Sequence, residues 1–557
     1  MRRTAAIGAA CCALASPAAV IAQGIAEPAP KPFVETATFT VQGFVQNQTG
    51  VFVAPDESAE REYRPEPTVP GTMFPSNHGD RLGRLSMLRN TLQLEADWHP
   101  HRRFSLHAIV RGVVSLPLSV DREAQVPDAG YLSEPERRVR WVSERFYQEA
   151  DLREIWLDWT PHDLVTLRLG RQLVAWGESG QARLRDVVNP IDSTWHFGAL
   201  ESFEDQRLPL WMLRAMVEVP PLRGALDVVW IPMVPFVERP EDTVTTPLTF
   251  VGAWGLPQPP LQGDTSVMPQ KIHSKVFGYP EQTPESSRVG ARWRGEVGPI
   301  AYSLMYFWGH QLTPPIPAYY VTSTGGINDV WVRFPRMHVA GLSLEYNVPF
   351  PVSTMLKLEA TVEPDRTYAP QSEADPAGFE SLPDGSTKTI FRPVEKFTAN
   401  YALTIQQPAI VRFLNPSDVV VVALQFAHSF LPTFDKDEKL LEVPGYDSTL
   451  LTKHQFRLGG SIFTSYLHGM ITPRITGAWL FGYDGLRQGF DKDNLSSFED
   501  VAFRNAGGFL SVSCQFAFGD HWRMLLALNQ FFGDDPYYGA GFYRDRDEVN
   551  LTVRYQF

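Results

Sequence analysis

Residues 164–195 read LVTLRLGRQLVAWGESGQARLRDVVNPIDSTW, and this stretch joins a strand to an unusual loop. Residues 165–170 alternate apolar side chains with polar or small ones, which is the period-two pattern of a half-buried strand. The alternation then stops, and a segment with Trp176 and several charged residues follows until Asn189-Pro190 breaks any regular structure. A strand that runs directly into such a segment predicts a loop that folds back onto the rest of the protein.

The same alternation recurs through the chain, in segments joined by short turns and long loops in turn. Paired across their short turns, the expected strands are 90–98 with 104–112, 152–159 with 165–171, 211–219 with 225–232, 288–295 with 301–310, 337–347 with 354–363, 396–407 with 418–430, 453–468 with 472–483 and 508–518 with 522–532, besides single strands at 38–46 and 548–557. Short turns on one side and long loops on the other are typical of an outer-membrane barrel.

We therefore expect an all-β protein, a single transmembrane antiparallel barrel with short periplasmic turns and long extracellular loops, some of them folded into the lumen. The count is about eighteen strands, and because boundaries from one sequence shift by a few residues, the expected range is about 14–18.

Strand length and composition favour a membrane barrel over a soluble protein. No run of about 18 apolar residues follows residue 22, which excludes transmembrane helices, and amphipathic helical periodicity is nearly absent. Many strands have about 10 residues or more, enough to cross a bilayer at a tilt. Repeats of fixed period, as in a propeller or a β-helix, are missing. Aromatic residues stand near the strand ends, where an interfacial girdle would place them: Trp98, Trp159, Trp293, Trp479 and Tyr555.

Residues 1–22 have the features of a secretory signal peptide. Two arginines follow the first methionine, residues 5–15 are apolar but too few to span a bilayer, and small residues precede a cleavage site after Ala22. A lipoprotein cysteine at position 11 or 12 is the alternative, with a poor lead-in sequence. We divide the chain into a signal peptide, residues 1–22, and an outer-membrane barrel domain, residues 23–557.

The composition excludes several kinds of site in that domain. Residues 23–557 hold one cysteine, Cys514, so neither an internal disulfide nor a cysteine metal cluster can form. Residues 1–22 contain two arginines and no acidic residue, so their removal changes the formal charge from −13 to −15. This charge argues against nucleic acid as a partner, and we expect no cofactor.

The last strand carries an aromatic signal. Apolar residues alternate with polar ones through 549–556, Tyr555 is on the apolar side, and the sequence ends at Phe557. Tyr555 and Phe557 together resemble the signal that the outer-membrane barrel assembly machinery reads. The alternative is a chain that simply ends in a strand.

Three short motifs carry a family resemblance: Gly170-Arg171-Gln172, Trp176-Gly177-Glu178-Ser179 and Val188-Asn189-Pro190-Ile191-Asp192. Together they resemble the outer-membrane family catalogued as domain of unknown function 1302. An early strand with Gly43, the strand pair at 90–112 and the C-terminal aromatic extend the likeness over most of the chain.

Members of that family are regarded as large barrels, often encoded near inner-membrane exporters of the hydrophobe-efflux type and lipoprotein-fold partners. The resemblance therefore implies a barrel surrounded by outer-membrane lipids, transport of hydrophobic or amphiphilic molecules, and a possible inner-membrane hydrophobe exporter and periplasmic lipoprotein as partners. The loops at 48–84 and 234–286 are long for the family, which leaves their role open.

Charged side chains on the strands are expected to point into the lumen, because a lipid-facing Arg or Lys costs about 2–4 kcal/mol at the membrane midplane. A charged pore wall and a set of Arg–carboxylate pairs that lock the interior are both open interpretations. The expected wall residues are Glu95, Asp97, Arg111, Glu154, Asp158, Arg168, Arg292, Arg294, Lys357, Glu359 and Arg554, with Glu363 beside them.

The loop after residue 171 is the candidate pore constriction. We expect Arg171 and Glu178 to brace the turn, because a guanidinium can hold a carboxylate by two bonds. A latch that only stabilises the wall is the alternative. Trp176 and Trp195 would offer apolar faces to an amphiphilic solute, and the residues expected to line the constriction are Arg183, Arg185, Asp186 and Asp192.

Other function classes find less support. A barrel hydrolase needs a histidine beside a nucleophile, but the candidates are scattered without a serine context: His107, His196, His310, His428 and His468. The His99-Pro100-His101 turn has no acidic partner nearby, so a metal site there is less expected than a solvated turn. A sheath around a partner cytochrome would need a partner's haem, because no Cys-x-x-Cys-His sequence occurs. The sequence thus favours an outer-membrane channel, not an enzyme, for small hydrophobic or amphiphilic molecules.

Overall fold

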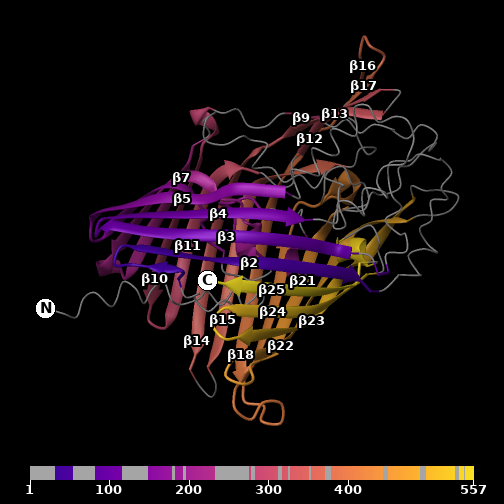
Figure 1. Cartoon of the computed structure of the whole chain (residues 1–557). Helices are drawn as coiled ribbons and strands as arrows, with labels where there is room; N and C mark the ends of the chain where they lie inside the picture. Colours follow the sequence, from indigo (N-terminus) through magenta and orange to yellow (C-terminus); the bar gives the residue numbers. More distant parts are fainter. Residues whose placement is uncertain are drawn as a thin grey trace, which may run out of the picture.

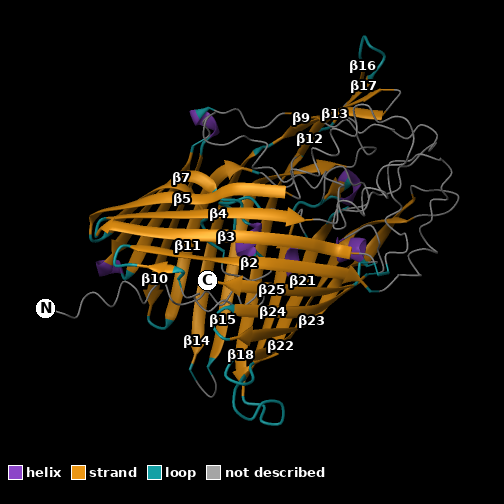
Figure 2. Cartoon of the chain, viewed as in Figure 1, coloured by secondary structure: helices purple, strands orange, loops and turns teal. Residues whose placement is uncertain are grey.

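The computed structural model describes residues 32–53, 82–83, 85–115, 148–177, 182–191, 196–232, 275–277, 283–311, 316–323, 326–349, 353–370, 378–442, 450–489, 497–533, 539–544 and 546–557. Strands make up most of these residues, and helices are confined to a few short turns (Figure 2). In the described part of the chain, none of the helices has the length and apolarity to cross a membrane. The expected signal peptide, residues 1–22, lies outside the described residues.

Eighteen antiparallel strands close into one barrel (Figure 1). In chain order they are β2 (Phe39–Phe52), β3 (Leu85–His101), β4 (Phe104–Ser115), β5 (Gln148–His162), β6 (Val165–Gln172), β7 (Leu210–Val219), β8 (Gly224–Ile231), β10 (Arg288–Val297), β11 (Ile300–His310), β14 (Arg336–Val348), β15 (Thr354–Pro370), β18 (Val394–Ala409), β19 (Val420–Phe430), β21 (Thr452–Thr464), β22 (Ile471–Gly489), β23 (Ser497–Phe518), β24 (Trp522–Phe532) and β25 (Glu548–Gln556). Each pairs with the next, and β25 returns to β2 with Phe44 opposite Gln556 and Phe52 opposite Glu548.

Closure removes the free sheet edges, which would otherwise leave backbone groups without partners in a membrane. The seam is completed by reciprocal bonds between Gly43 and Phe557, in which each backbone N–H donates to the other residue's carbonyl oxygen at 2.8 and 2.9 Å. With an even number of strands, β2 begins and β25 ends at the rim that carries the short turns. We call this the short-turn rim and the opposite end the long-loop rim.

The two faces of the wall differ as a membrane barrel requires. On β4, Val110 and Val114 are exposed on the outer face, whereas His107, Arg111 and Ser115 are buried toward the lumen. Four of the five expected girdle aromatics are exposed on the outer face: Trp98, Trp159, Trp479 and Tyr555. An apolar outside and a polar inside follow from the cost of placing charge against lipid.

Smaller elements decorate this barrel. Two short strands, β1 (Val34–Glu35) and β20 (Leu440–Leu441), extend the main sheet. A separate five-stranded sheet stands beyond the barrel wall at the upper right of Figure 1 and consists of β9 (Lys275–Phe277), β12 (Ile316–Ser323), β13 (Gly326–Arg333), β16 (Gly378–Ser381) and β17 (Thr387–Ile390). The short helices are η2 (Gly198–Leu200), α4 (Phe203–Gln206), η3 (Pro220–Leu222), η5 (Pro284–Ser286), η6 (Lys436–Glu438) and η7 (Gly539–Tyr543).

The barrel expected from the sequence is confirmed, at the upper end of the expected strand count. Each expected strand coincides with an observed one, and the observed strands are longer mainly toward the long-loop rim, as where 508–518 belongs to β23 (Ser497–Phe518). Sequence periodicity missed the small separate sheet, because its strands are short and lie in what reads as loop.

Candidate functional site

The candidate site is built on the segment between β6 and β7, residues 173–209, which we call the lumen loop; the structure describes its residues 173–177, 182–191 and 196–209. The strand before it contains Gly170, whose φ of +146° is a conformation that suits glycine. A Cβ at this position would collide with the backbone of Ile155 and Trp156 on β5. Glycine is therefore required at this position of β6.

One side chain holds the two ends of the lumen loop together. The Asn189 Oδ1 atom accepts a hydrogen bond from the Val174 N–H at 2.8 Å. The Asn189 Nδ2 group donates to the carbonyl oxygens of Leu208 at 2.8 Å and Gln172 at 3.3 Å. The Asn-Pro pair that looked like a simple structure breaker is thus the closure of the loop.

The first part of the lumen loop packs against one side of the barrel. Trp176 is fully buried, and its ring lies over Gly290 of β10, where a Cβ would not fit. The surrounding cluster, the Trp176 cluster, consists of Val174, Trp176, Val188, Leu210, Met212, Val229, Ile231, Met305, Phe307 and Val339. Its members come from the loop and from β7, β8, β11 and β14. Burial of this much apolar surface fixes the loop to the wall.

A buried carboxylate lies at the N–H edge of the Trp176 ring. Asp227 on β8 accepts from the Trp176 indole N–H at 3.1 Å. It also accepts two bonds from Arg214, both at 2.8 Å, and one from Arg292 at 3.3 Å. Because charge-assisted and bidentate bonds are the strongest of their kind, Asp227 sets the position of the indole as well as of the two guanidinium groups.

A later part of the loop is fixed by charge. His196 is buried between two carboxylates, with Nε2 at 2.9 Å from Glu548 of β25 and Nδ1 at 3.3 Å from Glu201. Burial alone would lower the pKa of His196, but the charges of Glu548 and Glu201 raise this pKa to about 9. The histidine is therefore a cation at neutral pH, held as the centre of a buried acid–base–acid group.

Aromatic packing accompanies this group. The Phe197 ring lies edge-on to Phe509 of β23, Phe531 of β24 and Tyr543 of η7, with ring centroids 5.0–5.5 Å apart. Leu200 is buried in the same apolar cluster. We call His196, Glu201, Glu548 and these aromatic residues the His196 cluster.

The last part of the loop is held by arginines of β3, β4 and β5. Arg89 pairs with Glu201 at 2.6 Å, and Arg111 pairs with Asp205 at 2.7 Å. Burial would raise both carboxyl pKa values, but Arg89 with His196 lowers the pKa of Glu201 to about 2, and Arg111 with Arg153 holds that of Asp205 well below its ordinary value. Both carboxyl groups are therefore charged anchors at any physiological pH.

A β-bulge supplies one of these arginines. Ile109 on β4 pairs with Glu154, but the next pair is Val110 with Leu152, so Arg153 is an extra residue that faces the lumen together with Glu154. Its guanidinium donates to the carbonyl oxygens of Glu204 at 2.6 Å and Arg207 at 2.9 Å.

These contacts show that the lumen loop crosses the barrel. Its first cluster includes residues of β8, and its second includes Phe509 of β23. In the strand order, β23 lies nine steps from β8, which is half-way round a ring of eighteen. The loop is therefore attached to opposite sides of the wall and lies across the lumen.

Contacts within the loop stiffen the crossing. Arg207 pairs with Asp186 at 2.8 Å, and the Arg183 guanidinium lies 4.0 Å from the centre of the Phe203 ring. Burial raises the pKa of Asp186 although Arg207 opposes this, and burial lowers the pKa of Arg183 to about 10 although Asp186 opposes it. Arg183 thus remains a cation at neutral pH.

The residues expected to form a constriction occupy different places. Arg183 is half-buried in the crossing segment, whereas Arg185 and Asp186 are buried, with Arg185 donating to the Ser303 hydroxyl of β11. Arg185 and Asp186 therefore face protein and do not line an open pore. Glu178, Asp192 and Trp195 lie outside the described residues.

Arg171 lies just before the lumen loop, and its expected role in bracing the turn with Glu178 stays a prediction, because Glu178 lies outside the described residues. Arg171 is the penultimate residue of β6 and shares the outer face with Leu169 and Ile155. There it pairs with Asp151 at 2.7 Å and donates to the Pro209 carbonyl oxygen at 3.3 Å. Strand alternation, which the sequence shows, is the physical reason for its outward position.

The expected wall residues lie on the inward-facing register of their strands. Those that are buried are Arg111, Arg292, Lys357, Glu359, Glu363 and Arg554; those that are half-buried are Glu95, Asp97, Glu154, Asp158 and Arg168; Arg294 is exposed. Asp158 pairs with Arg168 and Lys357 with Glu345. These pairs agree with the interpretation of a locked interior, whereas the charged, selective pore wall stays a prediction.

The scattered histidines do not meet. His107 faces the lumen beside Glu95 and Asp97, and His310 contacts the Phe334 carbonyl oxygen through Nδ1. His428 is on the outer face, 3.0 Å from His454 between the two ring nitrogens, and His468 is in the turn after β21.

Sequence reasoning missed most of the loop anchors: Arg89, Arg153, Asn189, Glu201, Asp205, Arg207, Asp227 and Glu548. One local signal was available, because Ser202 with Asp205 three residues later is a helix-start pattern, and the Ser202 hydroxyl does accept from the Asp205 N–H at 3.1 Å. The other anchors pair residues far apart in the sequence and carry no local pattern.

A family model described as "Protein of unknown function (DUF1302)" matches residues 3–224 and 257–557. The unmatched residues 225–256 include part of the loop that looked long for the family. No curated protein matches the chain.

Several solved outer-membrane proteins are similar in fold at low identity. OccAB4 of Acinetobacter baumannii is 8% identical with a TM-score of 0.45, over 94% of this chain and 99% of that one. OccK5 (OpdH) of Pseudomonas aeruginosa is 9% identical with a TM-score of 0.44, over 93% and 98%. OpdK of P. aeruginosa, solved with vanillate, is 10% identical with a TM-score of 0.41, over 93% and 98%. At these values the likeness carries no argument about what this barrel transports.

Proposed function

This chain belongs to the DUF1302 family of outer-membrane-type barrels, and from that premise we propose that it is an outer-membrane channel for small amphiphilic molecules. The lumen loop would act as a fixed constriction. The observation that supports this most directly is the attachment of the loop to opposite sides of the wall, by the Trp176 cluster and the His196 cluster. A latch that only stabilised the wall would not need to cross the lumen.

The inner surface supports an amphiphilic solute. Two inward-facing or loop guanidinium groups lie over aromatic rings: Arg183 at 4.0 Å from the ring centre of Phe203, and Arg554 at 4.2 Å from that of Phe44. A guanidinium beside a ring offers both a charged group for a carboxylate and an apolar face for a hydrocarbon part. We therefore propose amphiphilic carboxylates as the first solute class to test.

The cellular setting is part of the proposal. It comprises removal of residues 1–22 as a signal peptide, insertion by the barrel assembly machinery through Tyr555 and Phe557, and cooperation with an inner-membrane hydrophobe exporter and a periplasmic lipoprotein. The placement of Phe557 at the β2–β25 seam is compatible with an assembly role. Pull-down from membranes with the barrel as bait tests the exporter and lipoprotein.

Single-channel conductance in planar bilayers tests the function. The refolded mature barrel should give steady steps, and a variant with residues 178–206 replaced by a short Gly/Ser linker should give larger ones, since this variant lacks the crossing segment and the loop residues of the His196 cluster. Octanoate should reduce the current at lower concentration than acetate does, because only octanoate has a hydrocarbon part to stack.

The matched control is a variant in which the same length of linker replaces part of the segment 233–274, which lies outside the described residues. Both variants must show the heat-modifiable migration of a folded barrel. A folded barrel that is silent with and without the lumen loop would contradict a channel and favour a structural barrel around a partner protein. A loss of steps in both variants alike would contradict the constriction.

A further inference from the structure

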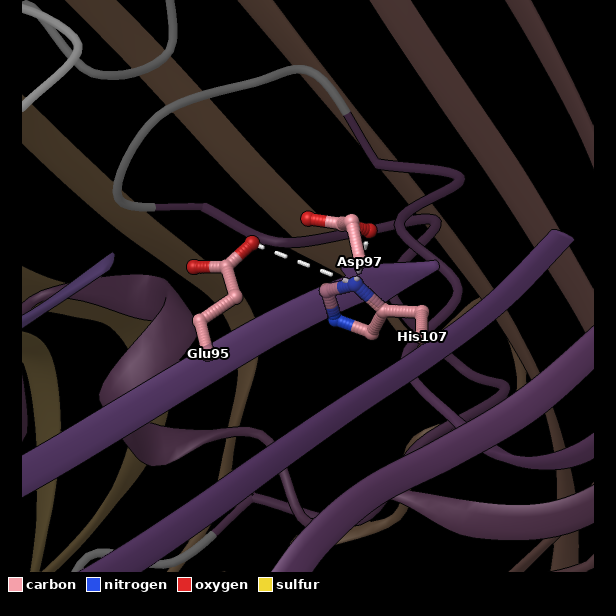
Figure 3. A group of neighbouring side chains, drawn as sticks. All are labelled: Glu95, Asp97 and His107. Atoms are coloured by element: carbon pink, nitrogen blue, oxygen red, sulfur yellow. Dashed lines mark hydrogen bonds and ion pairs between the residues drawn. The ribbon is translucent and has the colours of Figure 1, made fainter. Parts of the chain in front are cut away.

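A histidine and two carboxylates meet on the inner face of β3 and β4 (Figure 3). The His107 Nδ1 atom lies 2.8 Å from the Asp97 carboxylate and 3.9 Å from that of Glu95. The three donor atoms lie within 4.8 Å of one another. Asp97 and Glu95 are two residues apart on one strand, and His107 is directly opposite Asp97 on the next, so the register of the sheet itself creates the group.

The imidazole ring is held in a fixed orientation. His107 is stacked on Trp156 of β5, with ring centroids 4.6 Å apart and planes within 17° of each other. The other face of that indole carries the Arg168 guanidinium at 3.4 Å from the ring centre, and Arg168 is held by two bonds to Asp158. A stack of this kind pre-orients Nδ1 toward the carboxylates.

Several acidic groups elsewhere in the barrel are neutralised by an arginine, whereas this group is not. Asp158, Asp186, Glu201, Asp205 and Asp227 each pair with an arginine. Among the described residues, Glu95 and Asp97 have ion pairs with His107 alone, and a third carboxylate, Glu154, also faces this histidine. Glu154 is engaged by the Leu173 N–H at 3.3 Å, not by a cation.

We propose that Glu95, Asp97 and His107 form a binding site for a divalent transition-metal ion, with Zn²⁺ as the representative. One imidazole nitrogen with carboxylate oxygens is a donor set that such ions accept, whereas Mg²⁺ and Ca²⁺ prefer oxygen donors. The ion takes the place of the proton between Nδ1 and Asp97, and it neutralises the carboxylates that no arginine pairs. The remaining coordination positions face the lumen and are filled by water.

The structure accommodates this with side-chain movement only. Zinc bonds to histidine nitrogen and carboxylate oxygen are about 2.0–2.2 Å long, which places donor atoms about 3–3.5 Å apart. Asp97 at 2.8 Å is slightly closer to His107 than that spacing and Glu95 at 3.9 Å is slightly farther, so small side-chain rotations bring both to it.

Isothermal titration of the folded, mature, tag-free barrel with ZnCl₂ tests the proposal. We expect one Zn²⁺ per chain, with MgCl₂ giving no comparable heat. His107→Gln keeps a side chain of similar length but removes the nitrogen donor, and Asp97→Asn removes one carboxylate charge. Each should weaken binding about tenfold or more.

A double variant, His99→Ala with His101→Ala, is the matched control, because it removes two histidines of the adjacent turn and leaves the proposed ligands intact. It should bind Zn²⁺ as the unchanged barrel does. Every variant must keep heat-modifiable migration, which reports the closed barrel. Unchanged binding in folded His107→Gln, or binding lost in the turn variant, would overturn the assignment.

Discussion

The Trp176 cluster and the His196 cluster hold the same loop by different chemistry. The Trp176 cluster is built from apolar side chains around an indole, with its one carboxylate satisfied by Arg214 and Arg292. The His196 cluster is centred on an imidazolium between Glu201 and Glu548. The apolar packing of the Trp176 cluster depends little on pH, whereas the His196 cluster depends on the proton that keeps His196 charged. One side of the crossing is therefore permanent, and the other can be titrated.

Removal of the indole is expected to have the largest effect. Trp176→Ala opens a cavity in a fully buried cluster and leaves Asp227 with one partner fewer, which costs about 3–5 kcal/mol of loop attachment. The lumen loop should become sensitive to protease, and single-channel steps should be larger and noisier.

Trp176→Phe is the control, because it keeps an aromatic ring and loses only the indole N–H donor. The effect should fall to about 1–3 kcal/mol. Equal protease resistance in the Ala variant and the unchanged barrel would show that the Trp176 cluster does not hold the loop.

The second expected effect is a pH dependence at the His196 cluster. The pKa of His196 is raised from 6.5 to about 9 in the folded barrel, so its contribution is complete below about pH 6.5 and is lost as the pH rises through 9. The pKa of Glu201 is lowered to about 2, so its contribution is complete above its ordinary value and is lost only as the pH falls toward 2. Alkaline release of this side of the loop should therefore appear as increased current noise between about pH 7 and 9.5.

His196→Gln, which cannot be charged, should lack the alkaline step and should be noisier already at pH 6. The charged groups that face this position are Arg89, Glu201 and Glu548. The same step in both proteins would assign the titration to another residue.

The smallest expected effect is a change in ion selectivity, and it should differ between the neighbouring residues Arg183 and Arg185. Arg183 is half-buried in the crossing segment, so Arg183→Glu should shift selectivity toward cations by less than about fivefold, corresponding to about 0.2–1 kcal/mol. Arg185 is fully buried against Ser303, so Arg185→Gln should loosen the loop without changing selectivity. Reversal potentials in a salt gradient measure both, and a selectivity change in Arg185→Gln would place its charge in the pore.

Strand positions could be read from the sequence because each strand must show one face to lipid and one to the lumen. The expected strand 104–112 falls within β4 (Phe104–Ser115), and its polar positions His107 and Arg111 face inward as the alternation requires. The same reasoning places Arg171 on the outer face, opposite Ile155 of β5.

The anchors of the loop could not be read in this way. Glu548 and His196 are 352 residues apart in the sequence, and Arg153 faces the lumen only because a bulge interrupts the alternation. No local sequence pattern indicates either feature. A bulge turns a side chain toward the other face of the sheet, but the amino acid at that position is not itself a sign of the bulge.

The sequence by itself determined the barrel, the range of its strand number, the inward direction of its charges and the position of one exceptional loop. Each of these follows from a period of two along the strand and from the cost of charge in lipid, both of which are local properties. Only the tertiary structure decided that the loop crosses the lumen, that His196 lies between two carboxylates, and that Glu95, Asp97 and His107 meet. These depend on closure of the ring and on strand register, which bring together residues that no sequence window contains.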